Sequence, residues 1–385
     1  MKILIVHNSY GRYSGEEAVV DRTAAMFRSL GHEVALLQRT TEGARDTLGG
    51  KVRGFLCGLY SPGGVKAMRE ALRREQPDVV NIHNLYPFIS PAALFECRKA
   101  GVPVVMTVHN FRLICPTGLF MRNGQPCELC LQRGNEWGCV QHNCEHSMMK
   151  SVGYAARNAV ARWTGAYKKC ITRYACITDF QRQKLTEAGF EPERLFVIPN
   201  MVDAPDSYVP VQGDYVAYLG RLSFEKGYDL LFEVARRHPD IPFRMAGATD
   251  EMDGGEVPRN VQMMGHLSGE LLQAFVRDCR FVVIPSRWYE GFPMVVLESA
   301  CQGKATLGPR HGGFTEIIGE GDNAMGMLFE PGNVDDLENA VVSLWRQPQR
   351  CMALGEQAFG KLKWCYATDV VARRWQVLLE SIRKK

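Results

Sequence analysis

Short apolar runs alternate with amphipathic stretches along the first part of the chain. KILIV at residues 2–6 and HEVALL at 32–37 have the composition of buried strands, and the stretch 16–31 between them carries apolar residues at helical spacing. PDVVNIH and PVVMTVH are two further strands, each ending at a histidine, with a helical stretch at 90–101 between them. This β-α-β-α order predicts a parallel sheet with helices on both faces.

The same alternation starts again near residue 214. Strands are expected at 214–220, 242–247, 261–265 and 280–285, with helices at 228–238, 268–279, 293–303 and 334–349. Prolines 199, 205 and 210 cluster before it and suggest a hinge at 200–213. We therefore predict an α/β protein with two Rossmann-like domains, an N-terminal one at residues 1–205 and a C-terminal one at 206–365.

Charge and the length of the apolar runs limit the possible partners and locations of the protein. A net charge of +4 over 385 residues is too weak to indicate nucleic acid as a partner. The first apolar run is too short for a signal peptide, and no run approaches the roughly 20 residues of a membrane span. The sequence therefore predicts a cytoplasmic protein.

One segment, from His146 to Thr178, contains no acidic residue and has the pattern of a basic amphipathic helix or helix pair. Its apolar residues recur every three or four positions, from Met149 to Tyr174. It could contact an anionic membrane or a lipid-diphosphate acceptor. The alternative is that the apolar stripe packs on the sheet and the charges are simply solvated.

Cysteines gather at residues 115–146, which read as an insertion into the first domain. In a cytosolic protein such a cluster more often binds metal than forms disulfides. Few large apolar residues lie here, so the loop is not expected to order itself by burial. The sequence predicts a structural zinc site, with reduced thiols or disulfides as alternatives; its ligands are Cys127, Cys130, Cys139 and Cys144, with Cys115, His142 and His146 in reserve.

The stretch RWYEGFPMVVLES, residues 287–299, follows a predicted strand, where open α/β sheets bind ligands. Pro293 suits the first position of the next helix, whose free amides near Gly291, Phe292 and Met294 would bind an anion. Glu298 lies further along that apolar helix and needs polar partners, such as sugar hydroxyls. The alternative is a capping Glu290 and a paired core Glu298.

A second loop, in YLGRLSFEKGYDLL, carries Arg221 and Lys226 between glycines 220 and 227. Two cations at one sheet edge can hold a diphosphate. Alone, the loop could equally be a solvated basic loop. The presence of both loops in one domain, in this order, indicates a binding site much more strongly than either loop alone.

Together, G-R-L-x-x-E-K-G and the later E-G-F-P-M-V-V-L-E resemble the donor site of retaining nucleotide-sugar glycosyltransferases of glycosyltransferase family 4, which have the GT-B fold. The resemblance covers essentially the whole chain. SYGRYSGEEAVV resembles the family's N-terminal glycine-rich loop, although Ser14 stands where a second glycine is usual, and TVHN resembles its histidine-bearing strand end. In that fold two parallel-sheet domains face a central cleft, and a final helix, here 366–385, packs back onto the first domain.

The resemblance also implies roles for individual residues. Arg221 and Lys226 would hold the donor diphosphate and stabilise its charge in the transition state. Glu290 and the segment after it, Gly291, Phe292 and Pro293, would hold the donor sugar through the backbone amides that follow Glu290, and Glu298 would hold the ribose. His109 would approach the donor sugar and Gly15 would let the backbone approach a ligand. Hence the expected catalytic residues are His109, Arg221, Lys226 and Glu290.

The expected activity is that of a hexosyltransferase (EC 2.4). It would move a sugar from a nucleotide-diphosphate donor to a glycan or lipid-linked acceptor, with retention, in bacterial surface polysaccharide synthesis. No cofactor is expected for catalysis, since no Asp-x-Asp metal clamp follows a strand.

Three alternatives remain. A nucleotide-sugar epimerase of the same fold would act on the donor without an acceptor. A non-catalytic, zinc-stabilised scaffold would lack the combination of Arg221, Lys226, Glu290 and Glu298. A dinucleotide oxidoreductase is disfavoured because no G-x-G-x-x-G is complete. His83, which ends the neighbouring strand, is expected to be structural.

Overall fold

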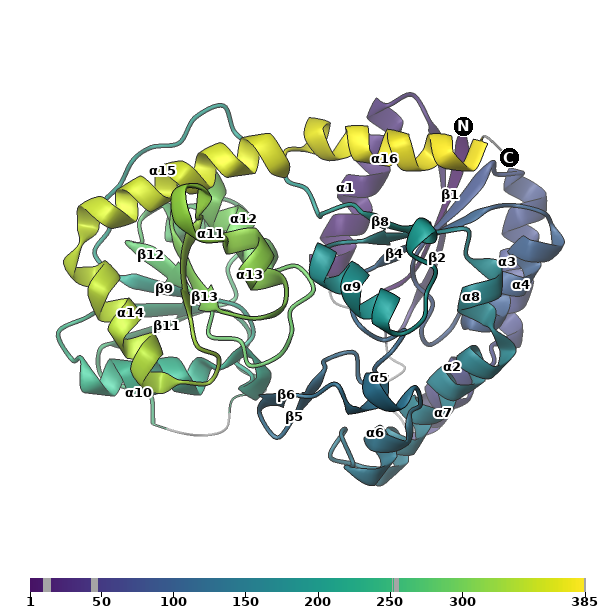
Figure 1. Ribbon diagram of the computed structural model, residues 1–385, viewed down its shortest axis with the longest axis horizontal. Helices are drawn as coiled ribbons and strands as arrows, with labels where there is room; N and C mark the ends of the chain where they lie inside the picture. Colours follow the sequence, from purple (N-terminus) through teal and green to yellow (C-terminus); the bar gives the residue numbers. More distant parts are fainter. Residues whose placement is uncertain (10–14, 43–47, 251, 253–255, 384–385) are drawn as a thin grey trace. The chain divides into compact units, whose positions relative to one another are not determined.

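The structure, a computed structural model, describes residues 1–9, 15–42, 48–250, 252 and 256–383. These form two compact units (Figure 1). The first contains residues 1–119, 128–201 and 371–385, and the second contains 120–127 and 202–370. Each unit is built on a six-stranded parallel sheet. The predicted α/β class with two Rossmann-like domains is confirmed.

The first unit has the strand order β2-β1-β3-β4-β7-β8. Strand β1, which lies between β2 and β3, is buried at six of its eight positions, as expected for a parallel strand with helices on both faces. The strand bounds are β1 Lys2–Ser9, β2 Glu33–Thr40, β3 Val79–Asn84, β4 Val104–Val108, β7 Arg173–Cys176 and β8 Leu195–Val197.

Helices of this unit include one from the far end of the chain. From Val371 onward, α16 packs its apolar face on the sheet, and Trp375 meets Phe27 edge to face at 5.1 Å between ring centroids. The helix begins two residues later than expected, at Thr368. The helices are α1 Gly15–Ser29, α2 Leu48–Leu59, α3 Pro62–Glu75, α4 Leu94–Lys99, α5 Leu129–Arg133, α6 Trp137–Gln141, α7 Met148–Thr164, α8 Ala166–Cys170, α9 Asp179–Glu187 and α16 Thr368–Arg383.

The second unit has the order β11-β10-β9-β12-β13-β14. Its strands are β9 Val216–Leu219, β10 Phe243–Ala246, β11 Val261–Gly265, β12 Phe281–Val283, β13 Thr306–Pro309 and β14 Gly326–Phe329. Its helices are α10 Tyr228–Arg237, α11 Gly269–Arg277, α12 Met294–Cys301, α13 Gly312–Ile318, α14 Val334–Arg346 and α15 Pro348–Cys365. The carboxyl ends of β9 and β12, which are neighbours, bring the two predicted donor loops to one sheet edge.

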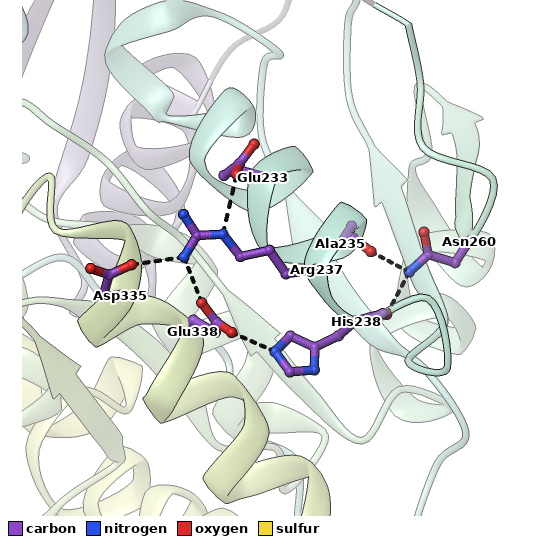
Figure 2. A network of polar contacts seen from close by, with 7 residues as sticks. All are labelled: Glu233, Ala235, Arg237, His238, Asn260, Asp335 and Glu338. Atoms are coloured by element: carbon purple, nitrogen blue, oxygen red, sulfur yellow. Dashed lines mark hydrogen bonds and ion pairs between the residues drawn. The ribbon is translucent and has the colours of Figure 1, made fainter.

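A polar network joins α10 to α14 in this unit (Figure 2). Arg237 contacts Asp335 and Glu338, each at 2.7 Å, and the Nε2 of His238 lies 2.7 Å from Glu338. At the end of α10, Asn260 donates to the carbonyls of Ala235 and His238. Exposed ion pairs contribute little stability individually, so this network adds only modestly to the packing of α10 against α14.

The basic segment 146–178 forms a helix pair, as one form of the prediction had it, but it ends in a strand. Gly165, with φ of 70°, ends α7, and the segment then forms α8 and strand β7. Tyr167, Ile171 and Tyr174 are buried, but Met149 and Trp163 on α7 are 75% and 72% exposed. The packed alternative is therefore wrong for α7.

Helix α7 buries a cationic side chain, that of Arg157, while several of its apolar side chains stay exposed. The guanidinium of Arg157 lies 4.4 Å from the ring centroid of Tyr86 and 4.1 Å from that of Tyr154, and it donates to the carbonyl of Pro116 at 2.8 Å. Periodicity alone assigns Arg157 to the solvated face. Two aromatic rings and a carbonyl lower the free-energy cost of burying its charge.

The cysteine-rich segment is divided between the units. Residues 120–127, which carry the short hairpin β5 Met121–Arg122 and β6 Gln125–Pro126, belong to the second unit, and the rest belongs to the first. Within the first unit, Arg162 pairs with Glu136 and Lys184 with Glu128, each at 2.9 Å. Phe120 and Leu131 are buried in their respective units. Ion pairs and a few buried side chains therefore order parts of this segment, which the sequence did not predict.

Candidate active site

An ion pair joins the two predicted donor loops in the second unit. The Nζ of Lys226 lies 2.7 Å from Oε1 of Glu290, and the Ser286 hydroxyl donates to the same oxygen at 2.6 Å. Glu290 is buried, and Lys226 also lies 5.3 Å from the ring centroid of Trp288. The sequence selected both charged residues but not their direct pairing. A buried carboxylate with two donors is well held, and it leaves the ammonium fixed at the end of β9.

A second charged pair braces these loops. Arg287 binds Asp229 on α10 through two contacts of 2.5 and 2.6 Å, and it donates to the carbonyl of Phe224 at 2.8 Å. Gly227 is required between the loops, because a Cβ there would lie 2.0 Å from the carbonyl oxygen of Pro285. Sequence reasoning missed Arg287 and Asp229. A basic residue directly after the apolar strand was the available signal.

The start of α13 holds the Glu290 loop from another side. The amide of Gly313 donates to the Glu290 carbonyl at 2.8 Å, and a Cβ at Gly313 would lie 2.5 Å from the carbonyl oxygen of Gly291. Just before it, the buried His311 donates through Nε2 to the Ser286 carbonyl at 3.1 Å. Burial lowers the pKa of His311 to about 4, so its ring is neutral near pH 7. Neither residue was predicted to belong to the site.

Helix α12 begins where the sequence suggested, with one shift. Pro293 occupies the N-cap position and Met294 is the first helical residue. The first amides of such a helix have no intrahelical acceptor and can bind an anion. Phe292 packs its buried ring against Tyr366, so only its backbone is available to a ligand. Glu298 is half-buried on the same helix.

Arg221 is more open than Lys226. Its side chain is 50% exposed and pairs with Glu225, four residues later, at 2.8 Å. The Tyr218 hydroxyl donates to the Arg221 carbonyl at 2.6 Å, which fixes the backbone of the loop. The second unit thus brings Arg221, Lys226, Glu290 and the start of α12 to the ends of neighbouring strands.

In the first unit, His109 follows β4 and is hydrogen-bonded to His83 on β3. His109 Nε2 lies 2.8 Å from His83 Nδ1, and His83 Nε2 lies 2.8 Å from Oδ1 of Asn81. Burial lowers the pKa of both histidines, that of His109 to about 3. His83, expected to be merely structural, therefore contacts the predicted catalytic histidine directly.

The glycine-rich loop is described only in part. Gly15 is the exposed first residue of α1. A Cβ at this glycine meets no described atom within 4 Å, so packing within the described residues does not require glycine here. Residues 10–14 of the predicted loop lie outside the described residues.

The four predicted zinc ligands do not form one described group. Cys127 belongs to the second unit, and Cys130, Cys139 and Cys144 belong to the first. A hydrogen bond with Cys144, together with burial, raises the pKa of the Cys139 thiol, and Cys130 and Cys115 act on it electrostatically. Among the residues that the structure describes, no three His, Cys, Asp or Glu side chains are arranged to hold a metal.

Comparison with known proteins agrees with this geometry. Residues 13–205 match Glycosyltransferase Family 4, and residues 205–361 match Glycosyl transferases group 1. An uncharacterized 42.6 kDa protein in the cps region of Klebsiella pneumoniae is 25% identical over 69% of this chain and 66% of its own length. The alpha-D-kanosaminyltransferase of Streptomyces kanamyceticus is 24% identical over 79% of this chain and 78% of its own length.

Solved structures share the fold. Anabaena Alr3699/HepE in complex with UDP-glucose superposes with a TM-score of 0.67 at 16% identity, over 100% of both chains. With the family matches and two parallel-sheet units, this establishes the GT-B architecture. The chain belongs to glycosyltransferase family 4 and is a GT-B-fold glycosyltransferase (EC 2.4).

Proposed function

We propose that the protein transfers a hexose from a nucleotide-diphosphate sugar to a glycan or lipid-linked hydroxyl. The observation that carries this proposal is the Lys226–Glu290 pair beside the first amides of α12, with Arg221 on the same loop as Lys226. Cations and amides at neighbouring strand ends suit a diphosphate, and the paired carboxylate suits sugar hydroxyls. That HepE is solved with UDP-glucose supports a donor of this class.

A donor panel tests this proposal. UDP-, GDP- and ADP-sugars are added in turn, and the thermal midpoint is measured for each. One class is expected to raise the midpoint, because a ligand that binds only the folded state stabilises it. The responding donor is then incubated with and without acceptor glycans. Release of nucleoside diphosphate that requires an acceptor supports transfer, whereas conversion of the sugar without an acceptor would identify an epimerase.

The reaction is proposed to retain the donor's anomeric configuration without a divalent metal. The leaving diphosphate is stabilised by Arg221 and Lys226 and takes the proton of the acceptor hydroxyl, while His109 contacts the sugar. Fixed cations act most strongly on charge that develops in the transition state. Product NMR tests retention, and an inverted linkage would remove the protein from the retaining class. Turnover that is the same with and without added Mg²⁺ or Mn²⁺ tests independence from a catalytic divalent metal.

Bacterial surface polysaccharide synthesis is the proposed setting, supported by the relative from the cps region of Klebsiella pneumoniae. The acceptor would then be a lipid-linked saccharide at the inner face of the membrane. The described residues include no helix with the length and apolarity of a membrane span. We propose that the protein contacts this membrane peripherally.

An exposed apolar surface on α2 and α7 supports such contact. On these two helices, and at Tyr60 directly after α2, the large apolar side chains that are at least 39% exposed are Phe55, Leu56, Tyr60, Met148, Met149, Val152 and Trp163. The two helices pack closely, since a Cβ at Gly153 would lie 2.1 Å from the Phe55 ring. Arg53 and Lys150 are exposed nearby in sequence, and Lys168 and Lys169 follow on α8. Apolar side chains flanked by cations suit an anionic lipid surface.

Vesicle sedimentation tests the surface. A Met149→Ser and Trp163→Ser double variant is expected to lose binding to phosphatidylglycerol vesicles, because its most exposed apolar side chains are removed. Trp364→Ser is the matched control, since Trp364 is 82% exposed on α15 in the other unit. Wild-type protein that never sediments with anionic vesicles would contradict membrane docking.

A structural zinc remains part of the proposal, with a modified ligand set. In the first unit Cys144 is hydrogen-bonded to Cys139, and Cys130 and Cys115 act on it electrostatically, so we propose Cys115 as an alternative to Cys127 for the fourth ligand. Thiolates in this number suit a closed zinc site, and a bound ion would have to draw them together. Elemental analysis of Cys139→Ser, Cys127→Ser and Cys115→Ser tests the proposal. Metal-free wild-type protein with full activity would reject the site.

A further inference from the structure

His83, the hydrogen-bond partner of His109, is buried, and its burial limits how it can act. His83 is 4% exposed and lies between Asn81 and His109. His109 keeps part of its surface exposed. His83 therefore cannot itself touch a substrate, and anything it contributes must act through His109.

Asn81, at the buried end of this chain of hydrogen bonds, fixes which group donates in each one. Nδ2 of Asn81 lies 3.4 Å from the Val105 carbonyl and 3.1 Å from the Thr107 hydroxyl. A carbonyl only accepts, so the amide nitrogen faces it and Oδ1 faces His83. Because Oδ1 also only accepts, Nε2 of His83 must carry a hydrogen and donate.

The remaining direction follows from charge. A neutral imidazole carries one hydrogen, so Nδ1 of His83 has a lone pair and accepts from Nε2–H of His109. Burial and the neighbouring His109 and His7 lower the pKa of His83 well below its usual range, which keeps the ring neutral. His7, at the end of β1, is itself buried, and burial lowers its pKa as well.

We infer that His83 is a positioning residue that holds His109 in the Nε2–H tautomer, through a chain from the Val105 carbonyl by way of Asn81. The Nδ1 of His109 is then a bare acceptor, suited to a hydroxyl of the donor sugar rather than to its phosphates. This inference rests on the proposed function only for the ligand. The chain itself belongs to the free protein.

Histidine NMR of the free protein tests the tautomer directly. Protein labelled with ¹⁵N at the imidazole nitrogens gives distinct long-range proton–nitrogen patterns for the two neutral tautomers, and His109→Gln assigns the signals. His109 is expected to show a protonated Nε2 and a bare Nδ1. The opposite tautomer in the wild-type protein would overturn the inference, whether or not a nucleotide sugar binds.

Three variants probe the chain. His83→Leu removes the acceptor and is expected to give a tautomer mixture at His109 and to lower kcat by about tenfold or more, with the donor KM little changed. His83→Gln is the conservative rescue, because its amide can donate to Asn81 and accept from His109. Asn81→Asp favours a charged His83 that donates from Nδ1, which reverses the His109 tautomer.

The outcomes separate this role from a merely structural one. If His109 gives the same tautomer pattern in wild-type protein, His83→Leu and Asn81→Asp, His83 does not control it. If the variants shift the tautomer as expected while no nucleotide sugar is turned over, the chain stands and the proposed function fails.

Discussion

The ammonium of Lys226 and the carboxylate of Glu290 lie 2.7 Å apart, although 64 residues separate them in sequence. The contact joins the loop after β9 to the loop after β12. It is at once a stabilising ion pair and the centre of the proposed donor site. Its two roles can be separated by experiment.

Lys226→Met should lower both the thermal midpoint and turnover. The midpoint falls because the buried Glu290 loses its cation, a change that costs about 3–5 kcal/mol in comparable buried pairs. Turnover should fall by about 10²-fold, as expected when a charge partner of the transition state is removed. Adding Glu290→Gln should restore the midpoint but not turnover. Normal turnover in Lys226→Met would show that the lysine does not act on the diphosphate.

Arg287→Ala should destabilise the second unit more than Asp229→Ala, because both break the same two-contact pair but only the first also removes the hydrogen bond to the Phe224 carbonyl. The double variant should be less destabilised than the sum, with a coupling of about 0.5–3 kcal/mol. Denaturant unfolding, followed in all four proteins, measures this value. Additive effects would mean that the pair does not brace the loops.

Phe120→Ala should release the hairpin at 120–127 from the second unit. Phe120 is 1% exposed, and its ring centroid lies 6.1 Å from that of Tyr289, the residue before Glu290. Faster hydrogen exchange at 120–127 and a higher KM for the donor are the expected results. Met121→Ala, a half-buried neighbour, is the control. Equal exchange rates in wild-type and Phe120→Ala protein would argue against this packing.

Acid should destabilise the first unit before its carboxylates titrate. The folded pKa values of His83 and His109 lie below the unfolded value of about 6.5, that of His109 at about 3. Below pH 6.5 the unfolded chain binds protons that the folded chain excludes, so the free energy of unfolding falls as pH decreases, by about 2 kcal/mol per histidine at pH 5.

Thermal midpoints at pH 7.5 and 5 measure this loss. The His83→Gln, His109→Gln double variant should lose less stability on acidification than the wild type. His142→Gln, which changes an exposed histidine, should behave like the wild type. An equal loss in all three proteins would exclude the buried pair as its source.

Most of the fold could be predicted because parallel strands buried on both faces appear as continuous apolar runs, as in β1 and β4. The charged residues of the proposed donor site could be found because each lies in a loop after a predicted strand and the two loops together resemble a family motif. The structure adds that the ends of β9 and β12 lie side by side. Pairings across the site were not predictable. Lys226–Glu290, Arg287–Asp229 and His83–His109 each join residues far apart in the chain, and periodicity carries no information on such contacts.

Helix α7 shows a second limit of prediction from the sequence, which concerns burial rather than pairing. Its apolar residues recur at helical spacing, which normally predicts a buried face, yet Met149 and Trp163 are exposed and Arg157 is buried. The reason is local. The rings of Tyr86 and Tyr154 and the Pro116 carbonyl provide a site for the guanidinium, and small residues beside it allow close packing. Only tertiary structure reveals that site.

The central claim, that the second unit binds a nucleotide-diphosphate sugar through its strand-end loops and α12, is tested most directly by calorimetric titration. Wild-type protein and Glu298→Ala are titrated with UDP-, GDP- and ADP-glucose, with Glu270→Ala, an exposed change on α11, as the control. The wild type and the control should bind one donor class with about one site per chain. Glu298→Ala should bind it about tenfold more weakly or worse, because carboxylate hydrogen bonds to the ribose are lost. Wild-type protein that binds none of the donors, or Glu298→Ala that binds as tightly as the wild type, would contradict the account.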